Sequence, residues 1–218
     1  MTANTVIPGA DGRPRCRWCA AAPEFESYHD REWGFPVADD TRLFEKICLE
    51  GFQSGLSWRT ILAKRENFRR AFDGFDFRKI ARYGPRQIDR LVRDEGIVRH
   101  RGKIEAVINN ARCAVQVAQE HGSLAAYFWQ FEVDPTNVPA AQVRSTSPES
   151  IALSKDLKTR GWKFVGPTTV YAFMQAMGLV NDHAADCVIA AEAARLRKTF
   201  RRPPSSWMSA DKQKGPSR

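Results

Sequence analysis

The sequence predicts an all-α fold for this chain. Apolar residues recur at the three- and four-residue spacing of an amphipathic helix over most of its length. The periodic segments tend to follow Asp, Ser or Pro and to precede Gly, which are the usual signals for the start and end of a helix. No segment sustains the alternation of apolar and polar residues that a half-buried strand would show. A chain of 218 residues is long enough for a domain with a sizeable core.

Two helices are expected in the first third of the chain, over residues 39–51 and 57–72. The first begins at two aspartates, which suit a helix N-terminus. The second repeats the apolar spacing of the first. The apolar residues that set this spacing are Leu43, Phe44, Ile47, Trp58, Ile61, Leu62 and Phe68.

Four further helices are expected along the rest of the chain. Pro85 suits the first position of one of them, and Gly96 suits a position beyond its end. The last two also have Pro near the start and Gly after the end, and short connections join the elements. The expected segments are residues 85–96, 102–122, 147–161 and 166–178.

Targeting signals are lacking in the sequence. No run of about 18 apolar residues is present, so we expect no membrane-spanning segment. The first fifteen residues lack the apolar stretch of a secretory signal. We therefore expect a cytoplasmic protein whose five cysteines stay reduced, as buried thiols or metal ligands rather than disulfides.

The formal net charge of +9 indicates a polyanionic partner such as nucleic acid. Most of this excess lies in residues 195–218, which hold eight Lys or Arg and one acid, so a solubilising extension is the alternative. The Pro, Ser and Lys content of the same segment predicts disorder, at least in its last half. We expect a flexible arm over residues 1–14, a single helical domain over 15–194 and a basic, disordered tail over 195–218.

A possible metal site joins the two ends of the chain. On a helix, His183 and Cys187 would share one face, which is half of a tetrahedral zinc site. Cys16, Cys19 and His29 supply candidates for the other half, and spacing leaves open which cysteine is the ligand. A filled Cys2His2 set leaves no position for a reactive water, so such a zinc would be structural. The alternative is a buried cysteine beside a hydrogen-bonded histidine.

Glu50 is the candidate for a functional acid. It continues the apolar stripe of Leu43 and Ile47 at helical spacing, and a buried acid must be paired, hydrogen-bonded or functional. The alternative is an exposed carboxylate at the helix end beside Gly51. A carboxylate near aromatic rings suits a flat, electron-poor base. The aromatic residues near it in the sequence pattern are Trp18, Phe25, Tyr28, Trp33 and Trp58.

A basic turn over residues 96–103 separates two expected helices. Its two glycines let a ligand approach the backbone, and helix N-termini bind phosphate. It is similar to a helix-hairpin-helix DNA-binding element, although the L-P-G-x-G signature is absent; a solvated charged turn is the alternative. The residues expected to contact DNA here are Arg99, Arg101, Gly102 and Lys103, with His100 between the arginines.

With these segments in view, the chain resembles DNA-3-methyladenine glycosylase I, the Tag family. The shared stretches are CRW, YHDREWG, LFEKICLEGFQSGLSW, GIVRHRGKI and KFVGPTTVYAFMQAMGLVNDH. They occur in the order of the family and run from about Cys16 to Cys187. The resemblance implies a helical fold of the helix-hairpin-helix glycosylase superfamily. It also implies a zinc-linked module that joins residues 15–35 to residues 180–190.

The resemblance assigns roles by position. It makes Cys19 a bystander of the zinc site and gives Glu50 the catalytic, base-recognising role. Phe25 stands where the family often has Tyr, so a hydroxyl contact is absent there. The implied zinc ligands are Cys16, His29, His183 and Cys187. The implied base-binding residues are Glu50, Trp58, Tyr28, Trp18 and Trp33, while Gln53 and Leu56 would probe the duplex and fill the gap left by a flipped nucleotide.

The implied activity is that of a monofunctional glycosylase of the EC 3.2.2 class in the bacterial cytoplasm. It would flip 3-methyladenine out of double-stranded alkylated DNA and release the free base, leaving an abasic site. No lysine stands out as a Schiff-base nucleophile, and a monomer is expected. The alternatives are a zinc-containing DNA-binding module without catalysis, a glycosylase whose lesion range includes 3-methylguanine, and a structural helical protein.

Overall fold

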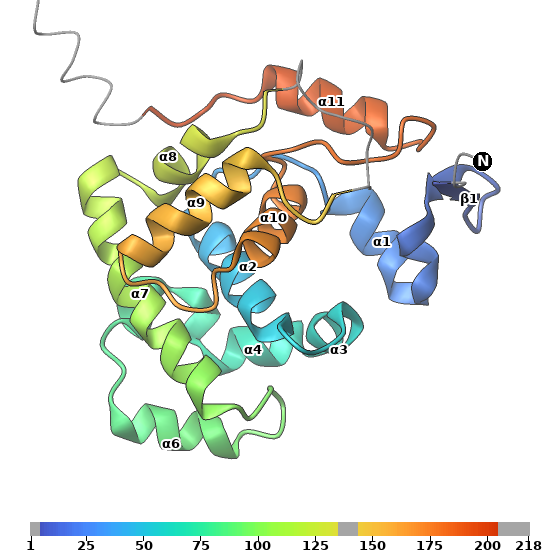
Figure 1. Cartoon of the computed structure of the whole chain (residues 1–218). Coiled ribbons are helices and arrows are strands. Elements are labelled where there is room, and N and C mark those ends of the chain that lie inside the picture. The colour runs from blue at the N-terminus through green and yellow to red at the C-terminus, as the bar shows by residue number, and fades with distance from the viewer. Residues whose placement is uncertain (1–4, 135–143, 205–218) are drawn as a thin grey trace, which may run out of the picture.

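The computed structural model describes residues 5–134 and 144–204, and these residues form a mostly helical protein, as the sequence predicts (Figure 1). No helix among the described residues has the length and apolar character needed to cross a membrane. The α-helices are α1 Pro23–Arg31, α2 Asp40–Gln53, α3 Trp58–Ala63, α4 Arg65–Ala71, α5 Phe77–Ile80, α6 Pro85–Arg93, α7 Arg101–His121, α8 Leu124–Phe128, α9 Pro148–Thr159, α10 Pro167–Ala176 and α11 Ala190–Thr199. Short 3-10 helices are η1 Arg17–Ala21, η2 Asp73–Phe75 and η3 Trp129–Phe131.

Helix α2 lies at the centre of the fold and contacts α3, α7, α8 and α10 (Figure 1). Its N-terminus is capped by Asp39, whose carboxylate accepts a hydrogen bond from the Arg42 amide at 2.8 Å. Because neighbours surround it, its residues from Leu43 to Phe52 are all buried. The expected stripe through Leu43 and Ile47 is therefore in the core, and it carries Glu50 into the interior with it.

The helix expected over residues 57–72 is divided into α3 and α4 at Lys64, whose φ and ψ are −97° and 1°. Lys64 Nζ donates to the carbonyls of Glu95 and Gly96 at 3.0 and 3.2 Å, which ties the break to the α6–α7 connection. The break lets Phe68 enter the core in α4 while α3 follows a separate axis. No proline or glycine marks this position, so the sequence carried no signal for it.

The helices expected in the second half are present close to their expected bounds. Helix α7 starts at the capping side chain of His100 and ends at Gly122, whose φ of 88° is the left-handed conformation that glycine adopts freely. Helices α9 and α10 begin with Pro148 and Pro167 at a first-turn position and pack against each other. These local signals were sufficient because proline and glycine act on the backbone before any packing.

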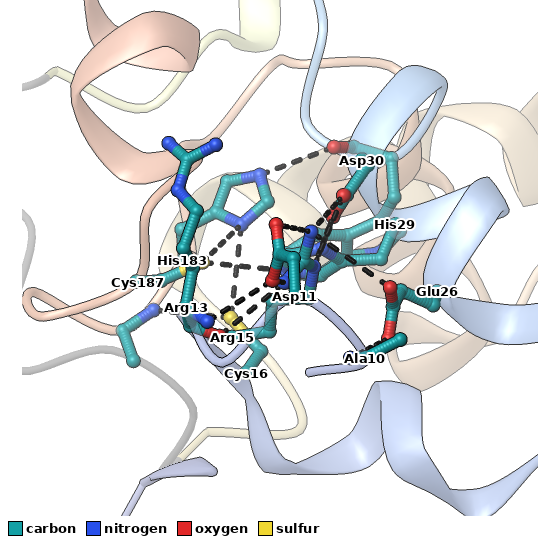
Figure 2. A network of polar contacts seen from close by, with 12 residues as sticks. Ala10, Asp11, Arg13, Arg15, Cys16, Glu26, His29, Asp30, His183 and Cys187 are labelled. Atoms are coloured by element: carbon teal, nitrogen blue, oxygen red, sulfur yellow. Dashed lines mark hydrogen bonds and ion pairs between the residues drawn. The ribbon is translucent and has the colours of Figure 1, made fainter. Parts of the chain in front are cut away.

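The N-terminal segment differs from the flexible arm that the sequence predicts. Residues Val6–Pro8 form strand β1, which pairs antiparallel with β2, Pro14–Cys16. The Arg15 guanidinium fixes this hairpin to α1 through bonds of 2.8 to 3.1 Å to the Asp30 carboxylate (Figure 2). Strands of three residues are too short to show a sequence period, which explains the missed pairing. Residues 1–4 lie outside the described part of the chain.

The C-terminal end also differs from expectation. His183 and Cys187 are not on a helix, because the chain over residues 181–188 runs through bends and turns before α11 starts. Part of the predicted tail, residues 195–199, belongs to α11. Arg197 is buried there and donates to Glu132 and to the carbonyl of Val133 at 2.9 and 3.1 Å. Residues 205–218, where disorder was predicted, lie outside the described residues.

Candidate active site and metal centre

A cavity of about 310 Å³ opens between α1, α2, α3 and α10, and we call it the aromatic cavity. It brings together the five residues that were expected to bind the base, with Gln53 beside them. The described residues that line it are Trp18, Tyr28, Trp33, Lys46, Glu50, Gln53, Trp58, Arg144, Ala172 and Gln175. The walls of the cavity thus come from segments that lie far apart in the sequence, and only folding brings these segments together.

Glu50 is buried in the last turns of α2 with 6% of its side chain exposed. One carboxylate oxygen lies 2.6 Å from Lys46 Nζ, one helical turn earlier. Burial lowers the pKa of Lys46, and the charge of Glu50 acts in the opposite direction. The predicted alternative of an exposed helix-end carboxylate is therefore wrong, because Glu50 is buried where α10 packs against α2.

Lys46 is one of four lining residues for which the sequence predicted no role; the others are Arg144, Ala172 and Gln175. Its Nζ donates to Tyr28 Oη at 2.8 Å and lies 3.4 Å from the centre of the Trp58 ring. Burial, followed by the charge of Glu50, raises the pKa of Tyr28 well above its ordinary value, so this residue stays a phenol. The i, i+4 spacing of Lys46 and Glu50 is visible in the sequence, but that pattern usually marks a solvated helix face.

Aromatic rings form most of the remaining wall. Trp18 and Trp33 meet edge to face with ring centres 5.1 Å apart, and Tyr28 and Trp58 lie 5.5 Å apart. The Nε1 atoms of Trp18 and Trp58 are buried without a hydrogen-bond partner among the described residues. Phe25 is not part of the lining and packs 5.9 Å from Trp18. The cavity thus offers ring faces to a flat ligand.

The rim of the cavity carries the residues expected to probe a duplex. Leu56 is 42% exposed on the turn between α2 and α3, and Gln53 lies at the end of α2. A second hollow continues from Glu50 and Gln53 past this turn to Thr168 and Thr169 at the start of α10. An exposed leucine beside an open cavity is suited to insertion between bases.

The expected metal ligands converge on one point. The ligand atoms of Cys16, His29, His183 and Cys187, which we call the Cys/His cluster, all lie within 4.8 Å of one another and are buried. Sγ of Cys187 is 3.5 Å from Nε2 of His29 and 3.8 Å from Nδ1 of His183. A tetrahedral zinc with its usual bond lengths would separate sulfur and nitrogen ligands by roughly 3.6 Å. The donor set and spacing therefore fit zinc.

The outer nitrogens of both histidines are hydrogen-bonded (Figure 2). His29 Nδ1 lies 2.7 Å from the Asp30 carboxylate, and His183 Nε2 lies 3.1 Å from the carbonyl oxygen of Trp33. Such bonds direct the other ring nitrogen of each histidine toward a metal. Hydrogen bonding by Cys16, with the two histidines, also lowers the pKa of Cys187, which favours the thiolate that binds metal.

Cys19 stays outside this cluster. Its side chain is buried with Ala22 and Phe25, and burial raises its pKa to about 11. An apolar, protonated thiol of this kind is a poor ligand. The choice between Cys16 and Cys19 that spacing left open is therefore resolved by position, because β2 brings Cys16 to the two histidines.

The Cys/His cluster and the aromatic cavity are in direct contact. Trp33 lines the cavity, and its ring lies 4.7 Å from the His183 ring, edge to face. Gly34 has a φ of +86°, and a Cβ there would lie 2.6 Å from His183 Nε2. Only glycine permits this approach. The cluster thereby fixes the position of one cavity wall.

The basic turn is only partly as expected. Lys103 is buried and donates to the carbonyls of Phe52 and Ser54 at 2.8 and 2.5 Å. Its ammonium therefore hydrogen-bonds to backbone carbonyls at the end of α2 and does not face a phosphate. Arg99 and Arg101 remain about half exposed, although Arg101 pairs with Asp89 at 2.8 Å. The lysine was misassigned because the sequence does not show that α7 packs its first turn against α2.

Comparison with known proteins agrees with this geometry. The sequence model described as methyladenine glycosylase matches residues 18–190. DNA-3-methyladenine glycosylase 1 of Escherichia coli (strain K12) is 50% identical over 177 residues, which are 79% of this chain and 95% of that relative. A crystal structure of 3-methyladenine DNA glycosylase I superposes with a TM-score of 0.73 at 46% identity, covering 80% of this chain and 98% of the other.

A second solved structure is a single-residue variant of 3-methyladenine DNA glycosylase I in complex with 3-methyladenine. It superposes with a TM-score of 0.73 at 37% identity and covers 78% of this chain and 95% of its own. The matched part of this chain contains α1 to α10 and therefore every wall of the aromatic cavity. The chain belongs to the methyladenine glycosylase family.

Proposed function

We propose that this protein is a DNA glycosylase that flips 3-methyladenine out of alkylated double-stranded DNA into the aromatic cavity and releases it. The observation that supports this most is the buried carboxylate of Glu50 among aromatic rings, already holding a cation at 2.6 Å. A nucleotide methylated at N3 of adenine carries a positive charge on a flat ring. The site therefore offers the two contacts that such a base needs, a carboxylate and ring faces.

The reaction needs little from the protein, because a cationic base is already a good leaving group. The glycosidic bond breaks with its electron pair going to the base, which leaves as neutral 3-methyladenine. A water oxygen forms the new bond to C1′ of the sugar, and one proton of that water is released. Glu50 is the only acid among the described residues that line the cavity, and its role would be to hold the charged base and stabilise the flipped state.

A monofunctional reaction that leaves an abasic site follows from the same geometry. Strand cleavage would require an amine free to attack C1′ of the sugar. Lys46 carries the amine of the cavity, and its Nζ is engaged by Glu50, Tyr28 and the Trp58 ring. We therefore expect no cleavage of the strand without added base.

The duplex would lie across the rim of the cavity and the start of α7. Leu56 and Gln53 are placed to fill the gap left by the flipped nucleotide. Arg99, Arg101 and the backbone at Gly102 would contact phosphates, because they lie at or beside a helix N-terminus. In this footprint the cavity rim would contact the flipped nucleotide, and the start of α7 would contact the neighbouring DNA phosphates.

The Cys/His cluster would bind one structural zinc ion. All four ligand atoms are buried, and the outer nitrogens of both histidines are hydrogen-bonded. The bound ion would therefore cross-link the N- and C-terminal segments. The protein would act as a monomer in the bacterial cytoplasm. Elemental analysis of protein purified without a metal-affinity tag tests the zinc, and light scattering tests the monomer.

The activity is tested by incubating the protein with methylated duplex DNA and separating the released bases by chromatography. We expect 3-methyladenine with little 7-methylguanine; a 3-methylguanine peak would extend the lesion range. Glu50→Gln serves as the site variant, and Glu192→Gln, on the exposed face of α11, serves as the matched control. Absence of any released base from folded, zinc-loaded protein would leave a DNA-binding protein that retains the scaffold.

A further inference from the structure

The ammonium of Lys46 occupies the part of the aromatic cavity that would recognise the base. Its Nζ lies 2.6 Å from a Glu50 oxygen, 2.8 Å from Tyr28 Oη and 3.4 Å from the centre of the Trp58 ring. A carboxylate, a hydroxyl and a ring face are also the contacts that a flat cationic base would make. Only 7% of the Lys46 side chain is exposed, so these three contacts replace most of its hydration.

The charges of the cavity show why this placement matters. Among the described lining residues Glu50 is the single acid, whereas Lys46 and Arg144 are both cations. Nε and one terminal nitrogen of Arg144 are buried without a hydrogen-bond partner among the described residues, while its guanidinium also bonds to Tyr171. A cationic base would thus bring a third positive charge to a buried site that holds one carboxylate, and the low dielectric of the interior strengthens the repulsion.

We propose that Lys46 is a specificity-determining residue, an internal cation that a positively charged base must displace from Glu50 and the Trp58 ring before it is seated. This inference deepens the proposed function and rests on it. The four-carbon stem of lysine lets its ammonium move without a change in the backbone. The adjoining hollow, lined by Gln53 and the start of α10, gives it a path to solvent.

Displacement has a consequence for the order of events. Before the glycosidic bond breaks, the base carries the charge that competes with Lys46 for Glu50. After the bond breaks the base is neutral, whereas the ammonium of Lys46 is not. The returning lysine therefore competes better against the product than against the substrate, which favours release of the free base.

The test compares two ligands that share the N9-methylated adenine ring and differ in charge and in the methyl group at N3. The 3,9-dimethyladeninium cation imitates the lesion base with its bond at N9, and 9-methyladenine is neutral. Lys46→Met keeps the stem and removes the charge, Lys46→Gln also keeps a hydrogen-bond donor for Glu50, and Lys46→Arg keeps the charge. Lys64→Met is the control, because Lys64 bonds to backbone carbonyls outside the cavity.

We expect Lys46→Met and Lys46→Gln to bind the cation about tenfold more tightly than wild type, and 9-methyladenine within about threefold of wild type. Lys46→Arg and Lys64→Met should stay close to wild type for both ligands. Equal or weaker binding of the cation by the folded neutral variants would overturn the inference, as would absence of cation binding by wild type and every folded variant.

A measurement on the unaltered protein tests displacement directly. The buried ammonium of Lys46 should give a slowly exchanging nitrogen signal by NMR, identified by its loss in Lys46→Arg. We expect saturation with 3,9-dimethyladeninium to remove this signal, because the displaced ammonium exchanges with water. A signal that persists unchanged in the saturated protein refutes displacement. If wild type releases 3-methyladenine from DNA yet shows neither effect, this inference fails while the proposed function stands.

Discussion

The Cys/His cluster and the aromatic cavity are neighbours that share α1, yet they treat polar groups differently. In the cluster, both outer histidine nitrogens are hydrogen-bonded, to Asp30 and to the Trp33 carbonyl. In the cavity, the indole nitrogens of Trp18 and Trp58 are buried without a partner among the described residues. The outer bonds of the cluster hold its two imidazole rings in place, whereas the cavity walls carry buried donors that have no such partner.

The same difference separates the charges of the two sites. The cluster gathers two imidazoles and two thiols, whose thiolates a dication would neutralise, and all four ligand atoms are buried. The cavity gathers Glu50 and Lys46, which neutralise each other only until a charged base arrives. We therefore expect changes in the cluster to act on folding and changes in the cavity to act on recognition.

Loss of a cluster ligand should give the largest effect. Cys187→Ser removes one of four ligands, and we expect it to lower the free energy of unfolding by more than about 4 kcal/mol, or to prevent folding, because a metal-linked module loses its cross-link. Denaturant unfolding with and without chelator measures this. The matched control is Cys19→Ser, a buried thiol outside the cluster, which should keep the zinc. Equal zinc content in both variants would contradict the assigned ligands.

Glu50→Gln should act on recognition with little effect on stability. The neutral amide still accepts a hydrogen bond from Lys46 but no longer opposes the charge of the base. We expect the activation free energy for excision of 3-methyladenine to rise by about 2–3 kcal/mol, which lowers the excision rate roughly 30- to 150-fold. Single-turnover release from methylated DNA measures it, and a wild-type rate in this variant would remove Glu50 from its role.

Trp58→Leu should have the next largest effect on the cavity. It removes a ring face while keeping an apolar side chain, and stacking of a base on an aromatic ring contributes about 1–3 kcal/mol. We expect weaker binding of free 3-methyladenine within that range, measured by calorimetry. Trp162→Leu is a control for the loss of a buried indole, because Trp162 lies in the core outside the cavity. A stability loss without a binding loss in Trp58→Leu would place this ring in the core instead.

The smallest effect is expected at the basic turn, and it separates two residues that look alike in the sequence. Arg101→Gln should weaken binding of any duplex a few-fold and reduce the salt slope by about one unit, because an exposed phosphate contact is lost. Lys103→Met should lower stability instead, because Lys103 holds two carbonyls at the end of α2. Fluorescence anisotropy at several salt concentrations, beside thermal unfolding of both variants, measures the difference. An unchanged slope for Arg101→Gln would move the DNA footprint elsewhere.

Local chemistry in the sequence determined most of the helices. Proline at the first turn of α6, α9 and α10 and the apolar stripe of α2 act through the backbone and through burial on one face, so neighbouring residues are enough to read them. The candidate metal and base-binding residues were likewise predicted before the fold was known. A carboxylate is rare in an apolar setting, which is why Glu50 stands out, whereas the thiols and imidazoles stand out as a possible metal-ligand set.

Only the tertiary structure decided which of these groups meet. Spacing left Cys16 and Cys19 open and the family resemblance implied Cys16, but what carries Cys16 to the histidines is a hairpin too short to show a period. The turns at His183 and Cys187 replace the helix that spacing suggested. Lys46, for which the sequence predicted no role, lines the cavity, and Lys103, which was expected to contact DNA, is buried, because burial depends on how α2 packs against its neighbours. A sequence records which charges exist, but the distance between two charges and their access to water arise from long-range packing.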